Sequence, residues 1–126
     1  AGLVKASEQP QQALFRELYE EAGLTTSDVK ISEGARFVQE FAVPEGMVRE
    51  IVLSFDADVK AGVHPVNRDG SVSQFKSMEL SDALTKAKAG EVMYAAAISI
   101  CESAMRRAGS PIDEKWLHYR GQFHNI

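Results

Sequence analysis

The amino-acid sequence predicts an α+β fold or a three-layer α/β/α sandwich. Three observations support this class: a helical pattern comes first, two strand-like stretches follow, and helical patterns return in the second half. The chain of 126 residues is 44% hydrophobic and 25% charged, which is ordinary for a globular protein with its own core. We therefore expect a single domain over residues 1–126.

The first helix is predicted between Pro10 and Gly23. Proline suits the first helical turn because its missing N–H needs no partner there, and glycine readily adopts the left-handed conformation that ends a helix. Farther on, residues 35–43 and 47–59 are strand-like, and Pro44–Gly46 between them is a turn signal. These two stretches are expected to pair.

The second half of the chain is predicted to begin with a third, shorter strand at residues 72–80. Ser81 suits an N-cap, which predicts a short helix over residues 81–89. A long helix is expected over residues 92–109, and we expect it to be buried because its first half is apolar on nearly every side. A last helix is predicted at residues 111–120.

Charge and composition disfavour several classes of function. The formal net charge of −4 disfavours binding to a nucleic-acid polymer or an anionic membrane. No apolar run approaches membrane-spanning length, and residues 1–10 lack the pattern of a signal peptide. Cys101 is the one cysteine, which excludes an internal disulfide and a cysteine-based zinc site. A reducing, cytoplasmic setting is expected.

Three glutamates crowd one face of the first predicted helix. Glu17, Glu20 and Glu21 stand at i, i+3 and i+4, so their carboxylates can approach one point, and Arg16 is the one nearby cation. The apolar residues fall on another arc of the helical wheel: Leu14, Phe15, Leu18, Tyr19 and Ala22. A solvated acidic face is the simpler interpretation. A divalent cation, however, would remove the repulsion among the carboxylates, and oxygen ligands suit Mg²⁺ or Mn²⁺ and diphosphate chemistry.

The residues around the glutamates form a longer signature. It consists of Gly2, Glu8, Arg16-Glu17-Leu18, Glu20-Glu21 and Gly23-Leu24, separated by five, seven, one and one residues. This resembles the Nudix box, with all nine defined positions matching in one register. The resemblance implies an α/β/α sandwich in which the box forms a loop, a helix and a loop. It also implies Mg²⁺- or Mn²⁺-dependent hydrolysis of a small-molecule diphosphate, such as a nucleoside diphosphate linked to another group.

The resemblance also implies roles for single residues. Glu20 and Glu21 match the main metal-binding glutamates, and Glu17 matches a glutamate that binds metal or acts as a base. Arg16 matches an arginine that orients a glutamate by ion pairing.

The remaining positions of the box match supporting roles. Gly2 matches a loop glycine whose carbonyl can reach the metal, and Glu8 matches a glutamate that braces the loop or touches a second metal. Gly23 supports the box at the end of its helix.

The second half is similar, more loosely, to Nudix domains related to those fused to thiamine pyrophosphokinase. The similarity includes residues 67–80 and Gly90. That pattern has a glutamate where this chain has Ser71, which leaves a further metal ligand or base in doubt; Asp69 is the alternative carboxylate.

The family normally has two or three strands before the box, whereas the box here begins at Gly2. We therefore expect either an N-terminally incomplete domain or a chain that completes its sheet from a partner, which leaves a homodimer open.

Two other functions compete with a metal-dependent diphosphatase. One is a catalytically inactive Nudix-fold binding module, and the other is a helical interaction domain whose acidic face binds a basic partner. Among substrates, thiamine diphosphate analogues, nucleotide sugars and modified nucleotides are preferred in that order. Arg68 is expected to be solvated, with a phosphate contact as the minority interpretation.

Overall fold

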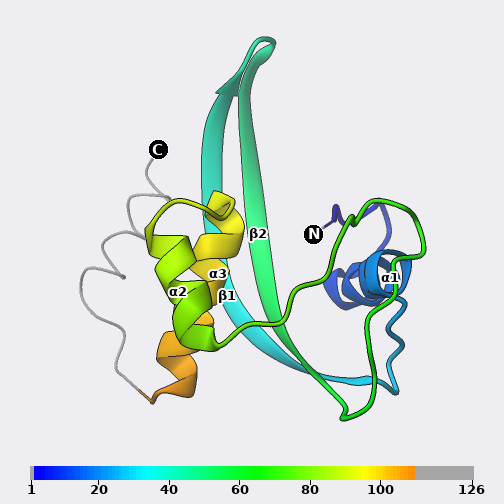
Figure 1. The fold of residues 1–126 in the computed structure, drawn as a ribbon. Helices are drawn as coiled ribbons and strands as arrows, with labels where there is room; N and C mark the ends of the chain where they lie inside the picture. The colour runs from blue at the N-terminus through cyan, green and yellow to red at the C-terminus, as the bar shows by residue number, and fades with distance from the viewer. Residues whose placement is uncertain (1, 110–126) are drawn as a thin grey trace. The chain divides into compact units, whose positions relative to one another are not determined.

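The computed structural model describes residues 2–109 and contains three helices and one two-stranded antiparallel sheet in that range. In chain order the elements are α1 (Pro10–Ala22), β1 (Val29–Val43), β2 (Gly46–Val59), α2 (Leu80–Lys88) and α3 (Tyr94–Arg107), as Figure 1 shows. Mixed helices and an antiparallel sheet confirm the predicted α+β class.

The described residues form two compact units. Unit 1 consists of residues 2–32 and 57–77, and unit 2 consists of residues 33–56 and 78–109. The prediction of a single domain over the whole chain stays a prediction.

Helix α1 lies in unit 1, and both of its predicted ends are confirmed. At its start the backbone N–H of Gln9 donates to Gln12 Oε1 over 2.8 Å, and Pro10 occupies the first turn. At its end Gly23 has the left-handed φ of 64°. The N–H groups of Gly23 and Leu24 donate to the carbonyls of Tyr19 and Leu18, over 2.9 and 3.2 Å, in a Schellman-type arrangement.

The core of unit 1 lies under α1. It is formed by Ala22, Leu24 and Val29, packed against Phe15, Leu18, Ile31, Ala57 and Val63. Tyr19, which the helical wheel placed with these apolar residues, is instead 46% exposed. Its position at the margin of the apolar arc explains the difference, because the core does not extend that far around the helix.

The two strands form one hairpin, and its turn is where the sequence predicts it. β1 begins at Val29, six residues earlier than the predicted start at residue 35. In unit 2 the pairing brings Gln39 Nε2 to 2.6 Å from Glu50 Oε2 and Arg49 Nε to 3.3 Å from Glu40 Oε1. Opposite polar partners of this kind favour one register over a slipped one.

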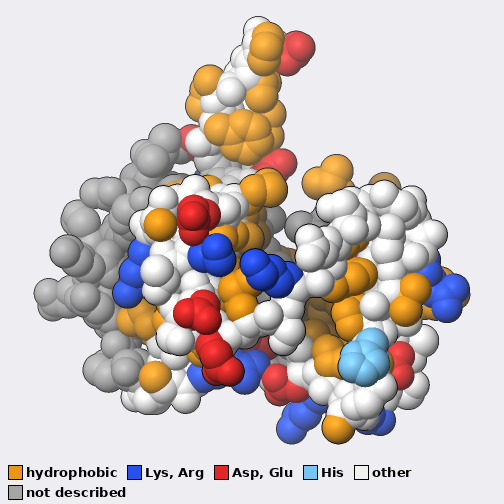
Figure 2. Space-filling view, in the orientation of Figure 1, with side chains coloured by type: hydrophobic (Ala, Val, Ile, Leu, Met, Phe, Trp, Pro, Cys, Tyr) orange, Lys and Arg blue, Asp and Glu red, His pale blue; other side chains and the backbone are white. Residues whose placement is uncertain are grey.

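The core of unit 2 lies between the hairpin and α3. Phe37 is fully buried, Ile98 is 5% exposed, and Val52 and Ala95 pack against them. Helix α2 packs on α3. The other face of β2 carries exposed apolar side chains, including Met47, Ile51 and Leu53, and Figure 2 shows hydrophobic side chains along the hairpin.

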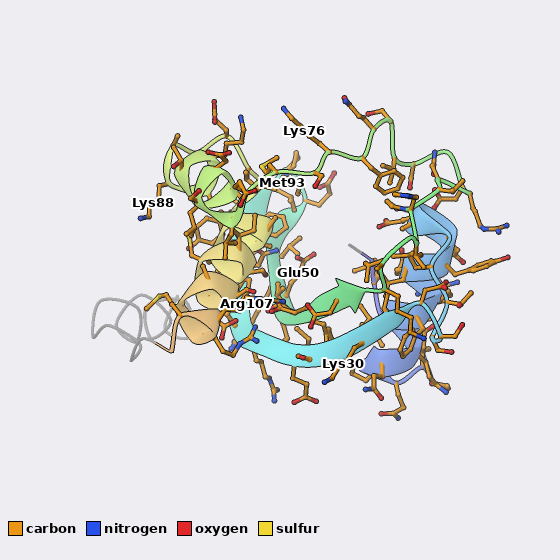
Figure 3. The ribbon with its side chains drawn as sticks, turned by 60° about the horizontal axis from the view of Figure 1, so that its bottom comes forward. Lys30, Glu50, Lys76, Lys88, Met93 and Arg107 are labelled. Carbon is orange, nitrogen blue, oxygen red and sulfur yellow. The ribbon has the colours of Figure 1, made fainter. Side chains whose placement is uncertain are left out.

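A charged cluster also joins α3 to β2. Ser103 Oγ donates to Asp56 Oδ2 over 2.7 Å, and Arg106 Nη2 and Arg107 Nε donate to the same oxygen, each over 3.2 Å. Arg106 also pairs with the buried Glu102 over 3.2 Å. Partial burial raises the pKa of Asp56, but the Ser103 hydrogen bond and the arginine charges outweigh it and leave that pKa below its usual value. Figure 3 shows Arg107 at the end of α3.

Three predictions about the second half need correction. The third strand is wrong, because residues 72–79 form neither helix nor strand and have no strand partner within the described range. The short helix begins at Leu80, and its N-cap is Glu79 instead of the predicted Ser81. The first half of α3 is not buried all round: Ile98 is buried, while Tyr94 is 41% exposed, because α3 packs along only part of its surface.

The predicted helix at 111–120 lies outside the described residues. Between residues 2 and 109, none of the helices is both long and apolar enough to cross a membrane.

Candidate functional site

The acidic face of α1 is defined here as Glu17, Glu20 and Glu21. The three residues lie within one and a half turns of the helix, and all three side chains are partly exposed. Ala13 and Ala22 on the same helix are buried. The acidic face therefore points away from the core of unit 1, where an ion or a ligand can reach it.

Arg16 connects two of these glutamates with the loop before the helix. Its Nη1 donates to Glu17 Oε1 over 2.5 Å and to Glu20 Oε2 over 3.4 Å. Its Nε and Nη2 donate to the two carboxylate oxygens of Glu8 over 2.9 and 3.1 Å, and Nη2 also donates to the carbonyl of Leu3 over 2.9 Å. The planar fork of an arginine allows this many directed contacts, which a lysine could not make.

Glu8 reaches Arg16 because the preceding loop turns back on itself. The N–H of Glu8 donates to the carbonyl of Lys5 over 3.0 Å, and Ser7 within this turn has a φ of 66°. A left-handed serine is uncommon and is seen where the surrounding contacts hold it in place. In return, the N–H of Lys5 donates to Glu8 Oε2 over 2.9 Å.

These contacts shift the pKa values of the ion pair. The hydrogen bond from Arg16, together with that from the Lys5 N–H, lowers the pKa of Glu8 to about 2. The carboxylates of Glu8 and Glu17 raise the pKa of Arg16 further above its usual value. Both groups therefore stay charged around neutral pH, so the ion pair between Glu8 and Arg16 persists there.

Replacing Glu8 by glutamine should make the chain less sensitive to acid. A carboxyl whose pKa is lowered on folding stabilises the folded state above its unfolded pKa of 4.5, and that stability is lost as the pH falls toward about 2. We expect Glu8→Gln to lower the melting temperature at pH 7 and to flatten its fall between about pH 4.5 and pH 2. Thermal melts at several pH values measure this.

Glu45→Gln is the matched control, since Glu45 is exposed in the hairpin turn, and it should follow the wild-type curve. Asp28, Asp56 and Asp69 also have lowered pKa values. Because the wild type and Glu8→Gln both contain them, their effects cancel when the two melting temperatures are subtracted. If the melting temperatures of the wild type and Glu8→Gln fell in parallel as the pH is lowered, the stabilising role of the Glu8–Arg16 ion pair would be contradicted.

The glycine that opens the signature lies against the acidic face. A Cβ on Gly2 would stand 1.9 Å from Cδ and 2.1 Å from Oε1 of Glu17, so a side chain here would displace the Glu17 carboxylate. Glycine at this position therefore lets the loop approach the Glu17 carboxylate as closely as it does. The structure thus brings together Gly2, Glu8, Arg16, Glu17 and Glu20, with Glu21 on the same helix and Gly23 at its end.

The donor types of the acidic face fit a hard divalent cation, because all three are carboxylates. Among residues 2–109, however, no group of three His, Cys, Asp or Glu side chains is arranged as a metal site. Instead, Arg16 Nη1 lies against both Glu17 and Glu20. A metal at this face requires those two side chains to turn away from Nη1.

The alternative carboxylate, Asp69, is turned toward its own loop. Its Oδ1 accepts hydrogen bonds from the Ser71 N–H over 2.8 Å and the Ser71 hydroxyl over 2.6 Å, which lower its pKa. Ser71, which stands where a glutamate was expected, thus shapes a turn with Asp69.

One feature near the site was not predicted. Residues 66–69 contact the end of α1, and the guanidinium of Arg68 lies over the Tyr19 ring, with 4.7 Å from Cζ to the ring centroid. No local pattern in the sequence indicates this pairing, because the two residues are far apart in the chain.

Comparison with known proteins agrees with the signature. The chain is similar to the RNA pyrophosphohydrolases of Vibrio vulnificus strain YJ016 (48% identity over 48 residues), Vibrio cholerae serotype O1 (46%) and Aliivibrio fischeri strain MJ11 (44%). Each match covers 38% of this chain and 28% of the relative, so the chain spans well under half the length of these relatives. No solved structure matches the chain.

The family comparison is broader than these pairwise matches. The model of the NUDIX domain matches residues 1–97, which includes the whole signature and most of the described residues. With the signature, the α+β fold and this match in agreement, the chain belongs to the Nudix family.

Proposed function

We propose that this chain hydrolyses a diphosphate linkage with the help of Mg²⁺ or Mn²⁺. The observation that carries the proposal is the acidic face of α1, in which Arg16 already bridges Glu17 and Glu20 as a cation. Family membership supports the same chemistry, and the name of the similar RNA pyrophosphohydrolases points to the same type of bond.

Glu17, Glu20 and Glu21 would hold the metal. A bound divalent cation neutralises diphosphate oxygens and lowers the pKa of water. Glu17 and Glu20, which contact Arg16 Nη1 in the structure, would turn toward the metal, while Glu8 balances the charge of Arg16 and anchors the loop that carries Gly2.

The reaction needs only water and the diphosphate. A water oxygen forms a bond to one phosphorus, the bond from that phosphorus to the bridging oxygen breaks, and the bridging oxygen leaves with the electron pair on the second phosphate. The proton of the water passes to one carboxylate of the acidic face and then to solvent. Two phosphorylated products result.

The proposed substrate is a small organic diphosphate, with thiamine diphosphate analogues, nucleotide sugars and modified nucleotides in that order. An RNA with a terminal di- or triphosphate is included because the similar curated proteins are RNA pyrophosphohydrolases and the terminus holds the only anhydride bonds of an RNA. The net charge of −4 disfavours contact with a long polyanion, but recognition of one terminus needs few phosphate contacts.

A substrate panel tests the proposal directly. The chain is incubated with each candidate, with and without Mg²⁺, and the products are identified by chromatography and mass spectrometry. We expect metal-dependent formation of two phosphorylated products from at least one candidate. Binding of Mn²⁺ and substrate without any product would instead identify a binding module, and neither binding nor product would contradict both functions.

A further inference from the structure

We propose that Arg68 is a positioning residue for the acidic face. Its guanidinium, stacked on Tyr19, holds residues 66–69 against the end of α1 and thereby fixes the backbone at Glu20. The proposal rests on the proposed function, in which Glu20 is a metal ligand. All these residues belong to unit 1.

The backbone of residues 66–69 caps the end of α1. The last carbonyls of a helix lack partners within the helix. The N–H groups of Arg68 and Asp69 both donate to the carbonyl of Glu20, over 3.2 and 3.0 Å, and the N–H of Val66 donates to the carbonyl of Ala22 over 2.8 Å. A residue of the acidic face thus receives two hydrogen bonds from a segment more than forty positions later in the chain.

This segment is shaped by its own side chains. Asn67 Oδ1 accepts the N–H of Gly70 over 3.1 Å, and Asn67 Nδ2 donates to the carbonyl of Val72 over 2.8 Å. Asp69 accepts two hydrogen bonds from Ser71, as described above. The loop therefore presents its N–H groups to α1 in a preformed arrangement, and a side-chain attachment to the helix can reinforce these backbone hydrogen bonds.

The Arg68 side chain supplies that attachment. Arginines commonly pair with carboxylates, but within residues 2–109 no carboxylate lies at ion-pair distance from Arg68. Its guanidinium instead lies over the half-exposed ring of Tyr19, the residue just before Glu20. This contact also gives a reason for the exposure of Tyr19, whose ring faces the loop rather than the core.

Gly23 allows the loop to come this close. A Cβ at this position would stand 3.0 Å from the carbonyl oxygen of Val66 and 3.3 Å from Nε of Arg68. Glycine at the end of α1 thus serves both the left-handed backbone and the docking of residues 66–69.

Backbone support matters at Glu20 because its side chain is the least restrained of those that Arg16 contacts. The contact from Arg16 to Glu20 is 3.4 Å long, against 2.5 Å to Glu17, and the Glu20 side chain is 43% exposed. Fraying of the last turn would displace Glu20 and Glu21 together, and the docked loop opposes it.

The test measures metal binding, catalysis and amide exchange in the same chain. Its variants are Arg68→Ala, Arg68→Lys, Tyr19→Leu and Tyr19→Phe, with Arg36→Ala as a matched control, since Arg36 is an exposed arginine in unit 2. The probes are Mn²⁺ binding by electron paramagnetic resonance, kcat and KM for the best substrate of the panel, and hydrogen exchange of the Arg68 and Asp69 amides.

We expect Arg68→Ala and Tyr19→Leu each to raise the Kd for Mn²⁺ and the rate of amide exchange by about two- to five-fold, the effect of one exposed cation–π contact. kcat should fall with KM unchanged. The variants Arg68→Lys and Tyr19→Phe should recover most of the loss, because each keeps a cation or a ring. The double variant Arg68→Ala/Tyr19→Leu should add little to either single variant.

Several results would overturn the inference. A raised KM with unchanged Mn²⁺ binding would make Arg68 a substrate contact, and a lowered melting temperature with unchanged binding and exchange would leave it a merely stabilising residue. If the wild type cleaves no member of the panel, the proposed function fails and Mn²⁺ binding alone decides the inference. A wild type that does not bind Mn²⁺ refutes it.

Discussion

Replacement of Glu21 by glutamine is expected to lower kcat/KM for diphosphate hydrolysis by more than about 100-fold. Loss of a residue that only supports a metal ligand costs about 10- to 100-fold, so loss of a ligand should cost more. Glutamine keeps the size of the side chain and its place on α1 but removes the negative charge that holds a divalent cation. The measurement is product formation at saturating Mg²⁺, with Mn²⁺ binding measured in parallel.

The control for this variant is again Glu45→Gln, which removes the same charge from the hairpin turn and should keep wild-type activity. A circular dichroism spectrum like that of the wild type shows that Glu21→Gln is folded. A folded Glu21→Gln variant with undiminished activity would remove Glu21 from the catalytic group, whereas loss of activity together with loss of Mn²⁺ binding would place it among the ligands.

Truncation of Phe37 to alanine is expected to lower the free energy of unfolding by about 3–5 kcal/mol. Phe37 is the one large side chain that is fully buried among residues 2–109, where it packs against Ile98 of α3 and Val52 of β2. Alanine would leave a cavity at the centre of unit 2 that neighbouring side chains fill only in part. Urea denaturation followed by circular dichroism measures the change.

Phe41→Ala is the matched control on the same strand, because Phe41 is 42% exposed and its truncation should cost less than about 1 kcal/mol. Phe37→Leu should fall between the two, since it retains most of the apolar volume. Equal losses for Phe37→Ala and Phe41→Ala would show that the core of unit 2 does not depend on Phe37.

The grouping of the candidate site residues could be predicted from the sequence because it is mostly local. Glu17, Glu20 and Glu21 share a face through helical spacing alone, and Arg16 follows from the same spacing. The family resemblance implied that Arg16 pairs with a glutamate and that Glu8 braces the loop, but it did not say that these two residues pair with each other, as they do here. The assignment of catalytic roles to these residues stays a prediction.

The arrangement of the carboxylates was less predictable. The sequence favoured three glutamates that converge on a cation, whereas Arg16 draws Glu17 and Glu20 toward its own nitrogen. Side-chain conformations of this kind depend on competing partners at a distance of a few ångströms, which spacing does not specify.

The sequence by itself determined the elements whose signals are short-range: the ends of α1 at Pro10 and Gly23, and the turn between β1 and β2. Only the tertiary structure decided that residues 72–79 form no strand, which part of α3 is buried, and that Ser103 donates a hydrogen bond to Asp56, 47 positions away. The docking of Arg68 on Tyr19 belongs with these. Turn and cap preferences act through a few neighbouring dihedral angles and can be recognised locally, while strand pairing, burial and long-range contacts exist only once distant segments have packed together.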